Sequence, residues 1–454
     1  MNKNNHFHLL GAVIATGILS FSGVLIETAM NVTFPTLINE FGLSTSKIQW
    51  VTTIYLLVIA ITIPLSSYFN ERFSARKLFL VANLIFLVGV LTNCFSPNFA
   101  MLLFGRLLQG VGTGIGLPLM FHLILTKAPL HKRGMMMGIG TLTTSIAPAI
   151  GPTYGGIISN SLDWRYIYIF LLPLVVISLV LGLACLPREG EKTPKKLALR
   201  PVIALSIMFF AFISALSAEH LMTFALLFIV GLVGAFLFVQ FNRKESLIDL
   251  GILKNHRFVA LIFSLLVYQA LLLGLSFVLP SFIQVSAGFS SSVAGLLMFP
   301  GALIGAVLAP ISGKVLDQIG ARKPITTGLI LAALGLALLF VFLPTKSLAL
   351  LLGAHIVLML GLGISYSNLM TCSLSTLATD QLSDGNALVN TLQQFIGAVA
   401  TAVVATTLSI FQGLNGFKVG TSHGTSIILA LFFILIIVSL IVSFPNLKKI
   451  RANH

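Results

Sequence analysis

Charged residues are scarce in this sequence. Only 9 % of its 454 residues are Asp, Glu, Lys or Arg, and 57 % are hydrophobic, whereas soluble domains carry about 25 % charged residues. A water-soluble protein of this length would need far more polar surface than the chain provides. The composition therefore excludes soluble enzymes and nucleic-acid-binding proteins, and it predicts a protein that folds in a lipid bilayer.

Cysteines and nucleotide-binding loops are also few or missing. The three cysteines, Cys94, Cys185 and Cys372, stand singly in apolar segments, which excludes a disulfide framework and a zinc site of paired cysteines. No Gly-x-x-x-x-Gly-Lys-Ser/Thr loop occurs, and no polar segment is long enough to form an ATP-binding domain. We therefore expect a protein that is not an enzyme and has no cofactor or metal.

Long apolar runs fill most of the chain. A spanning helix needs about 20 mostly apolar residues, and 14 runs meet this requirement. They cover residues 9–37, 47–68, 77–95, 99–126, 134–159, 165–186, 200–217, 220–241, 257–282, 291–316, 324–343, 347–372, 386–411 and 425–445. Only helices and closed barrels satisfy the backbone in lipid, and these runs are too long for barrel strands. The prediction is an all-α membrane protein of 14 spans, with the first broken at Pro35 and a tight turn at Ala218–Glu219.

The basic residues are distributed unevenly between the predicted loops. If the N-terminus is inside, 22 of the 27 Lys and Arg residues fall on the same side as both termini. Only Lys47, Arg165, Lys346 and Lys418 fall on the other side, and Arg106 lies within a span. Positively charged loops face the cytoplasm, and they attract anionic lipid head groups. The sequence therefore predicts a multi-pass protein of the cytoplasmic membrane with both termini cytoplasmic and no affinity for nucleic acid.

A weak internal repeat divides the chain into two halves. Residues 63–77 align with residues 309–323 without a gap, and the tripeptide Ala-Arg-Lys ends both copies. Symmetry of this kind is typical of transporters built from two parallel halves. The predicted organisation is an N-terminal six-helix bundle at 1–186, a cytoplasmic linker with two additional spans at 187–246, and a C-terminal six-helix bundle at 247–454.

Four motifs support a family assignment. They are Glu27-Thr-Ala-Met-Asn31-Val-Thr-Phe-Pro35 in the first span, Ser67-x-x-x-Glu71-Arg72 with Arg76 after the second span and again as Gly313-x-x-x-Asp317 with Arg322, Arg106-Leu-Leu-Gln109-Gly110 in the fourth span, and Pro148-Ala-Ile-Gly151-Pro152-Thr-Tyr-Gly155-Gly156 in the fifth. With these motifs the sequence resembles the major facilitator superfamily, and within it the fourteen-helix drug:proton antiporters. The resemblance spans nearly the whole chain, although Ser67 stands where the family has glycine and Glu27 where many members have aspartate.

The resemblance implies a multidrug efflux transporter, with a role in antibiotic resistance. The expected substrates are lipophilic, often cationic drugs, dyes, disinfectants or quinolone-type antibiotics, exported by a monomer in exchange for protons. One alternative is a facilitator or exporter of an endogenous metabolite or lipid. Another is a membrane receptor or enzyme with a borrowed fold, but the sequence contains neither a soluble sensor domain nor a catalytic constellation.

Glu27 is the strongest single candidate for function. It is the only acid within a predicted span, and an ionised carboxylate there costs about 2.5 kcal/mol or more. Gly23, Glu27 and Asn31 share one helical face, so we expect Glu27 to face a cavity and to exchange protons. Arg106 and Gln109 lie at a similar depth, and the hypothesis is that protonation of Glu27 weakens a link to them. Two alternatives are that Arg106 holds backbone carbonyls or water, and that Glu27 is purely structural.

Three further groups of candidate residues follow from the motifs and from the amide and aromatic side chains of the spans. The antiporter motif of the fifth span is expected to seal the interface between the halves, or to be a general packing face; its residues are Pro148, Gly151, Pro152, Gly155 and Gly156. The cytoplasmic loop residues expected to latch the halves are Glu71, Arg72, Arg76, Asp317 and Arg322. The substrate-cavity candidates are Asn31, Phe34, Tyr268, Gln269, Asn390, Gln393, Gln394 and Phe395.

Overall fold

The computed structural model describes the backbone of residues 8–186, 198–218, 220–245, 247–378 and 381–447, and every regular element in these ranges is a helix. The α-helices are α1 (Leu9–Val32), α2 (Phe34–Phe41), α3 (Thr45–Ile48), α4 (Trp50–Thr62), α5 (Ser66–Arg72), α6 (Ala75–Cys94), α7 (Phe99–Lys127), α8 (Leu130–Ser161), α9 (Tyr166–Cys185), α10 (Leu199–Leu216), α11 (Leu221–Lys244), α12 (His256–Ser281), α13 (Ser291–Ile319), α14 (Arg322–Phe342), α15 (Leu348–Leu374), α16 (Leu382–Asn415) and α17 (Phe417–Asn446). Short helical turns η1 (Ile63–Leu65), η2 (Leu250–Lys254), η3 (Phe282–Ser286) and η4 (Leu343–Thr345) join or extend them.

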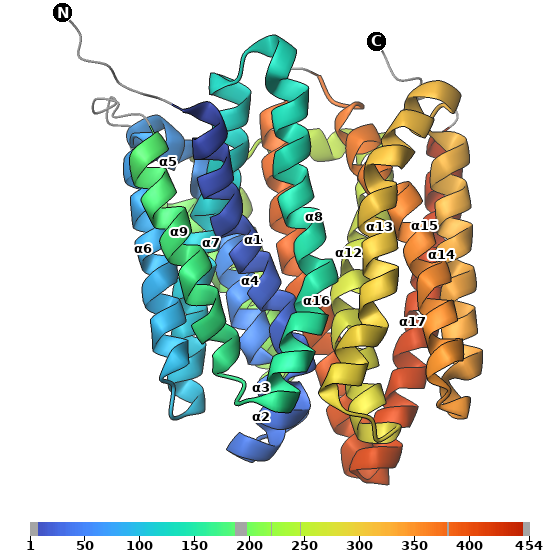
Figure 1. Cartoon of the computed structure of the whole chain (residues 1–454). Coiled ribbons are helices and arrows are strands. Elements are labelled where there is room, and N and C mark those ends of the chain that lie inside the picture. The colour runs from blue at the N-terminus through green and yellow to red at the C-terminus, as the bar shows by residue number, and fades with distance from the viewer. Residues whose placement is uncertain (1–7, 187–197, 219, 246, 379–380, 448–454) are drawn as a thin grey trace, which may run out of the picture. The chain divides into compact units, whose positions relative to one another are not determined.

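The helices form two compact units. Unit 1 comprises residues 1–30, 50–151 and 161–247, and unit 2 comprises residues 31–49, 152–160 and 248–454. In unit 1, α7 packs against α4 and α6, and α6 packs against α9. In unit 2, α15 packs against α13 and α14, and α14 packs against α17. The same pairing pattern thus occurs twice, and Figure 1 shows both sets of adjacent helices.

Glycines allow the closest helix contacts in both units. A Cβ atom at Gly112 of α7 would lie 2.7 Å from the Ala82 carbonyl oxygen of α6, and one at Gly361 of α15 would lie 2.5 Å from the Gly328 carbonyl oxygen of α14. Small residues let helix backbones approach each other in membranes, where apolar burial alone gives no preference for protein over lipid. These contacts position the polar side chains described below.

The first predicted span is interrupted near its end. α1 stops at Val32, and α2 begins at Phe34 with Pro35 in its first turn. Proline lacks the backbone N–H that would continue the helix, and its ring clashes with the preceding turn. α2 then ends at Gly42, whose φ of 62° is accessible to glycine at little cost. The predicted break at Pro35 therefore separates two distinct helices.

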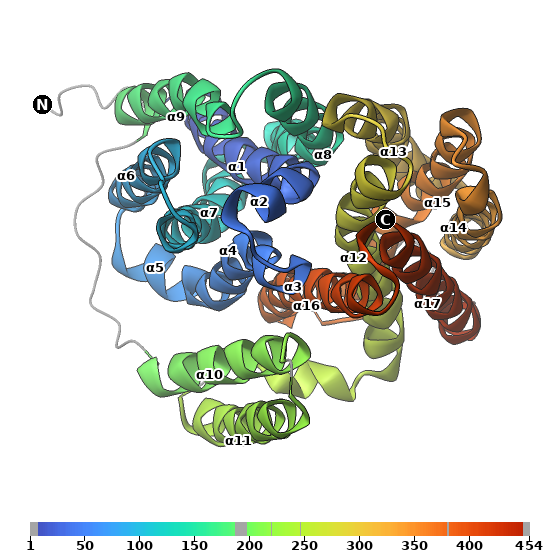
Figure 2. The ribbon, with the colours of Figure 1, turned by 90° about the horizontal axis from the view of Figure 1, so that it is seen from below.

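The two additional helices form an antiparallel hairpin. α10 and α11 pack along each other (Figure 2), where Gly231 contacts the Phe212 ring and Gly234 contacts the Met208 backbone. α11 is the least buried of the long apolar helices, since only 17 % of its most apolar window is covered by protein. Exposed apolar side chains of this density suit contact with lipid tails. The predicted turn lies between the two helices, although Glu219 and residues 187–197 are outside the described residues.

Thirteen helical segments in the described ranges are long and apolar enough to cross a membrane. They coincide with 13 of the 14 predicted spans. The remaining predicted span, 134–159, is covered by the continuous 32-residue helix α8, which is not among the 13. The all-helical membrane fold is thus confirmed, and the count of 14 spans stays a prediction.

Candidate functional site

Glu27 lies at the start of the last quarter of α1 and is 6 % exposed. The only other acid within a candidate span is Asp384, in the first turn of α16. Gly23, one turn before Glu27, leaves no room for a side chain because it contacts the Tyr55 hydroxyl and Thr113 Oγ1. This polar face of α1 therefore packs directly on polar side chains of α4 and α7.

Arg106 is the largest buried charged residue, with no exposed surface. Its Nε donates to the Val51 carbonyl at 2.8 Å, and its Nη1 donates to Gln109 Oε1 at 2.9 Å. The guanidinium carbon lies 4.2 Å from the centre of the Tyr55 ring, a stacked cation–π geometry. The Tyr55 hydroxyl in turn donates to Thr113 Oγ1 at 3.0 Å.

Glu27 and Arg106 interact through space without forming a direct ion pair. The charge of Arg106 acts on Glu27, but no oxygen of Glu27 lies within 4.0 Å of its nitrogens. The guanidinium holds a backbone carbonyl instead, which is the alternative that the sequence left open. The arrangement thus contains one buried acid and one buried cation, and the acid is not locked by its neighbour.

Tyr55 and Thr113 were not among the predicted site residues. Thr113 lies seven residues after Arg106 and four after Gln109, on the same face of α7, so helical spacing could have indicated it. Tyr55 approaches Arg106 only through the packing of α4 on α7, for which no local sequence signal exists. Gly110 and Gly114 contact α4 and Gly112 contacts α6, so these glycines serve helix packing.

A second polar group lies in unit 2. The Tyr366 hydroxyl donates to Gln269 Oε1 at 2.6 Å and accepts from Gln393 Nε2 at 2.6 Å. Ser365 Oγ and the Tyr268 hydroxyl are 2.7 Å apart, and the two tyrosine rings lie edge to face at 6.4 Å. The fold therefore brings together Tyr268, Gln269 and Gln393, which were predicted, with Ser365 and Tyr366, which were not.

The other predicted cavity residues lie apart from this group or have different contacts. Asn390 bonds Asn386 one turn away on its own helix. Asn31 Nδ2 donates to Ser276 Oγ at 2.8 Å, and the fully buried Phe34 ring meets Phe277 at 4.7 Å. Gln394 has a buried Oε1 without a hydrogen-bond partner, and Phe395 is half-buried. Amide and aromatic character alone did not distinguish packing residues from members of the polar group.

The antiporter motif lies on α8, which remains helical through Pro148 and Pro152. Within unit 1, Gly151 packs against Thr28 of α1. Within unit 2, the Gly156 carbonyl accepts from Ser291 Oγ at 3.0 Å. The carbonyl of Gly295 on α13 accepts from Thr153 Oγ1 at 3.0 Å. The motif thus forms a close small-residue contact with α13, while Gly155 is buried.

Of the residues predicted to form the cytoplasmic latch, the structure describes the side chains of the arginines only. Arg72 lies 5.9 Å from the Tyr68 ring and 5.6 Å from the Phe73 ring, and Arg322 lies 4.3 Å from the Phe444 ring. Arg76 is half-buried. The side chains of Glu71 and Asp317 fall outside the described residues, so the latch stays a prediction.

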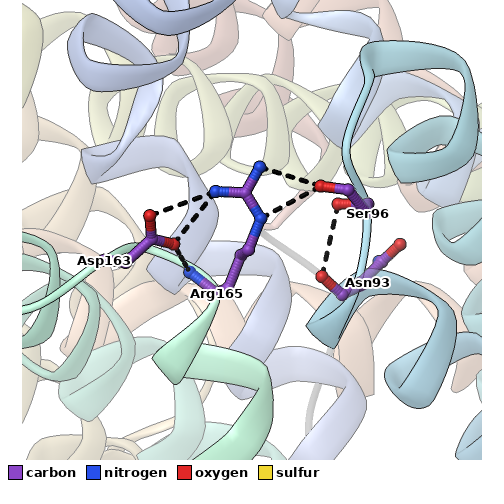
Figure 3. A network of polar contacts seen from close by, with 4 residues as sticks. All are labelled: Asn93, Ser96, Asp163 and Arg165. Carbon is purple, nitrogen blue, oxygen red and sulfur yellow. Dashed lines mark hydrogen bonds and ion pairs between the residues drawn. The ribbon is translucent and has the colours of Figure 1, made fainter.

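A polar brace closes one end of unit 1 (Figure 3). Arg165 donates to the Ser96 carbonyl from Nε at 3.0 Å and from Nη2 at 2.8 Å, and it pairs with Asp163 at 3.1 Å. Its guanidinium also lies 4.4 Å from the Trp164 ring. These contacts connect the loop after α6 to the start of α9.

In the described ranges no cluster of three or more His, Cys, Asp and Glu side chains could hold a metal ion.

Comparison with known proteins identifies the family. A sequence profile of the Major Facilitator Superfamily matches residues 16–402. The chain belongs to the major facilitator superfamily. A related superfamily protein, the lincomycin resistance protein LmrB of Listeria monocytogenes, is 34 % identical over 408 residues, which cover 88 % of this chain and 87 % of the relative. The multidrug export protein EmrB of Escherichia coli is 25 % identical over 405 residues, which cover 87 % of this chain and 79 % of the relative.

Solved structures of the major facilitator superfamily share the fold. A bacterial homologue of the human lysosomal transporter Spinster superposes with a TM-score of 0.69 over 97 % of both chains, at 14 % sequence identity. At this identity the likeness concerns the fold alone. The predicted superfamily is confirmed, and as a member of it the chain is a multi-pass membrane transporter.

Proposed function

We propose that this chain is a proton-coupled antiporter that exports lipophilic, often cationic drugs, dyes or quinolone-type antibiotics across the cytoplasmic membrane by alternating access. Relatives named for lincomycin resistance and multidrug export support the drug-efflux part of this proposal. The proton-coupling part depends on one observation, which is that Glu27 is almost completely buried and forms no ion pair with Arg106, whose Nε and Nη1 donate to Val51 and Gln109.

The chemistry of Glu27 explains why it suits exchange of a proton for a cation. A buried carboxylate needs a compensating positive charge or a proton. Because Arg106 forms no ion pair with Glu27, the carboxylate stays open to a proton or to a cationic drug. Competition between these two for one carboxylate couples export to proton uptake, since whichever binds must leave before the other does.

The proposed topology places 14 spans in the membrane, with α8 as the span beyond the 13 that apolarity alone identifies. Both termini then lie in the cytoplasm, as the distribution of basic residues favours. The protein acts as a monomer and uses no cofactor. The turn between α2 and α3, the loop before α7 and the start of α9 face outward.

The two units contribute differently in this mechanism. Unit 1 carries Glu27, Arg106 and Gln109 and handles the proton. Unit 2 offers amide and phenol groups around Tyr366, which suit a lipophilic drug with few polar atoms. The antiporter motif on α8 seals the interface between the halves in one state, and the charged loops at Arg72 and Arg322 latch the cytoplasmic side in the other.

The test is dye efflux in everted membrane vesicles with and without an imposed pH gradient. Wild-type protein should transport dye about tenfold faster with the gradient, and Glu27→Gln should lose this acceleration because the amide cannot bind a proton. The matched control is Glu40→Gln, an exposed acid on α2, which should behave as wild type.

Two results contradict the proposal. Transport by the wild type that ignores the gradient indicates a facilitator of a metabolite or lipid. Full gradient-driven export by Glu27→Gln, at a normal amount of protein in the membrane, removes Glu27 from the coupling mechanism.

A further inference from the structure

Unit 1 contains an unusual concentration of buried polar atoms without a hydrogen-bond partner. Among the described residues, they include both amide atoms of Asn93, Nη2 of Arg106, Nε2 of Gln109 and the hydroxyl of Tyr168. All four residues have no exposed surface. An unpartnered buried polar group costs about 1–3 kcal/mol, so five such atoms in one region need an explanation.

Packing contacts place these residues next to one another. Asn93 Oδ1 lies against Gly105, the residue before Arg106, where a side chain would have no room. Gly89, one turn before Asn93 on the same face of α6, contacts the Gln109 side chain. Asn93 and Gln109 therefore lie along the interface of α6 and α7, and Arg106 lies between them along the helix axis.

Tyr168 joins the group from α9. α9 packs along α6, and the Tyr168 hydroxyl is buried without a hydrogen bond of standard geometry. Asn93 and Arg106 are among the groups that interact with it electrostatically. Polar groups that face one another slightly beyond hydrogen-bond distance are commonly bridged by ordered water. Buried waters typically make about three hydrogen bonds to otherwise unsatisfied polar groups, and this cluster offers enough partners for at least one.

The cluster reaches from the centre of unit 1 to its surface. On the inner side, Arg106 and Gln109 lie beside Tyr55 and within electrostatic range of Glu27. On the other side, Asn93 is followed by Ser96, whose carbonyl accepts from the partly exposed Arg165 (Figure 3). In the proposed topology this end of unit 1 faces outward.

We infer that Asn93, Tyr168, Arg106 and Gln109 hold a hydrated site through which protons pass between the outer surface and Glu27, inside unit 1 and separately from the path of the drug. This inference rests on the proposed proton coupling. A proton enters as hydronium from bulk water at the Ser96–Arg165 end, each bound water accepts one proton and passes one on, and the Glu27 carboxylate receives the last. Arg106 stays protonated throughout and orients the waters.

The inference predicts variants that uncouple the proton from the drug. Asn93→Leu combined with Tyr168→Phe removes the amide and hydroxyl partners of the water at similar volume. The double variant should lose about fivefold or more of its pH-gradient-driven dye efflux. Its drug-for-drug counterflow, which needs no proton transfer, should stay within about twofold of wild type.

Matched variants separate this role from a structural one. Asn83 is also a fully buried amide on α6, and its Oδ1 lacks a partner too, but its Nδ2 donates to Ser178 Oγ at 2.8 Å. Asn83→Leu breaks this bond between α6 and α9, so it should lower both activities together with the amount of folded protein. Asn93→Ser replaces the amide with a hydroxyl, which can still bond a water, and leaves room for a further water, so it should retain at least about half of the gradient-driven efflux.

Three outcomes decide the question. Loss of driven efflux with retained counterflow in the double variant, and rescue by Asn93→Ser, support the route. Wild-type driven efflux in the double variant, or an equal loss of both activities, overturns it and leaves direct access of protons to Glu27 from the drug path. A wild-type protein without gradient dependence overturns the proposed function itself, and this result is visible before any variant is made.

Discussion

Arg106 in unit 1 and His355 in unit 2 occupy equivalent positions of the internal repeat, but their side chains differ in charge and in contacts. Asn98 caps α7 and Ser347 precedes α15. Counted from these two residues, Gly112 matches Gly361 and Arg106 matches His355. Both side chains are completely buried. The sequence repeat that begins at residue 63 in one half and 309 in the other extends back to pair Tyr55 with Gly301.

The contacts at these two positions differ in kind. Arg106 stacks on the Tyr55 ring and donates to two acceptors. The His355 ring packs against Gly301, and neither of its nitrogens has a hydrogen-bond partner in the described part of the chain. Helix packing is thus preserved in both units, whereas the buried charged residues among those described, Glu27 and Arg106, both lie in unit 1. In the proposed mechanism, this repeated helix packing lets one half handle the proton while the other binds the drug.

The largest expected difference in export is between two single variants, in which either Arg106 or His355 is replaced by leucine. Arg106→Leu should reduce gradient-driven export at least about tenfold, because it leaves Glu27 without its neighbouring cation. His355→Leu should change export by less than about twofold, since no acid depends on it. The measurement is initial dye efflux normalised to the protein in the membrane. Equal losses in the two variants would show that coupling is shared between the units.

The next largest effect concerns stability, and it tests the close helix contacts that both units share. Gly112→Ala and Gly361→Ala should each lower stability by about 1–3 kcal/mol, because the new Cβ meets backbone atoms of the adjacent helix. Thermal unfolding of the purified proteins in detergent measures it. Gly353→Ala, on α15 with nothing within 4 Å, is the control and should be neutral or stabilising by about 0.5–1 kcal/mol. A large loss in one unit alone would contradict this shared packing.

A smaller effect is expected in the polar group of unit 2. Tyr366→Phe removes the hydroxyl that joins Gln269 to Gln393, so drug affinity should fall about three- to tenfold while the dependence on the pH gradient is unchanged. Equilibrium dye binding and driven efflux measure the two separately. Tyr166→Phe, at an exposed position of α9, should alter neither. If Tyr366→Phe abolished gradient dependence, the division between the units would be wrong.

The sequence predicted those features that depend on local patterns. Apolar runs predicted the helices because lipid leaves a long apolar segment few other structures. Glu27 was conspicuous because an acid in a span is costly, and Arg106 with Gln109 followed from the motif of the fourth span and from their similar depth. The break at Pro35 followed from the chemistry of proline.

Features that depend on helix packing were not predictable from one sequence. The stacking of Arg106 on Tyr55 requires α4 and α7 to meet in a particular register. The group around Tyr366 draws residues from α12, α15 and α16, and Asn390 turned to its own helix instead of joining it. The Arg165 brace connects loops that are distant along the chain. In each case the partner is set by tertiary contacts, for which local periodicity gives no signal.

Proton release on drug binding tests the central claim most directly. Purified wild-type protein in weakly buffered detergent solution should release about one proton per bound cationic drug, because both compete for Glu27. Glu27→Gln should bind the drug and release none. Equal proton release by the two proteins would show that the exchanged proton resides elsewhere and would contradict the account.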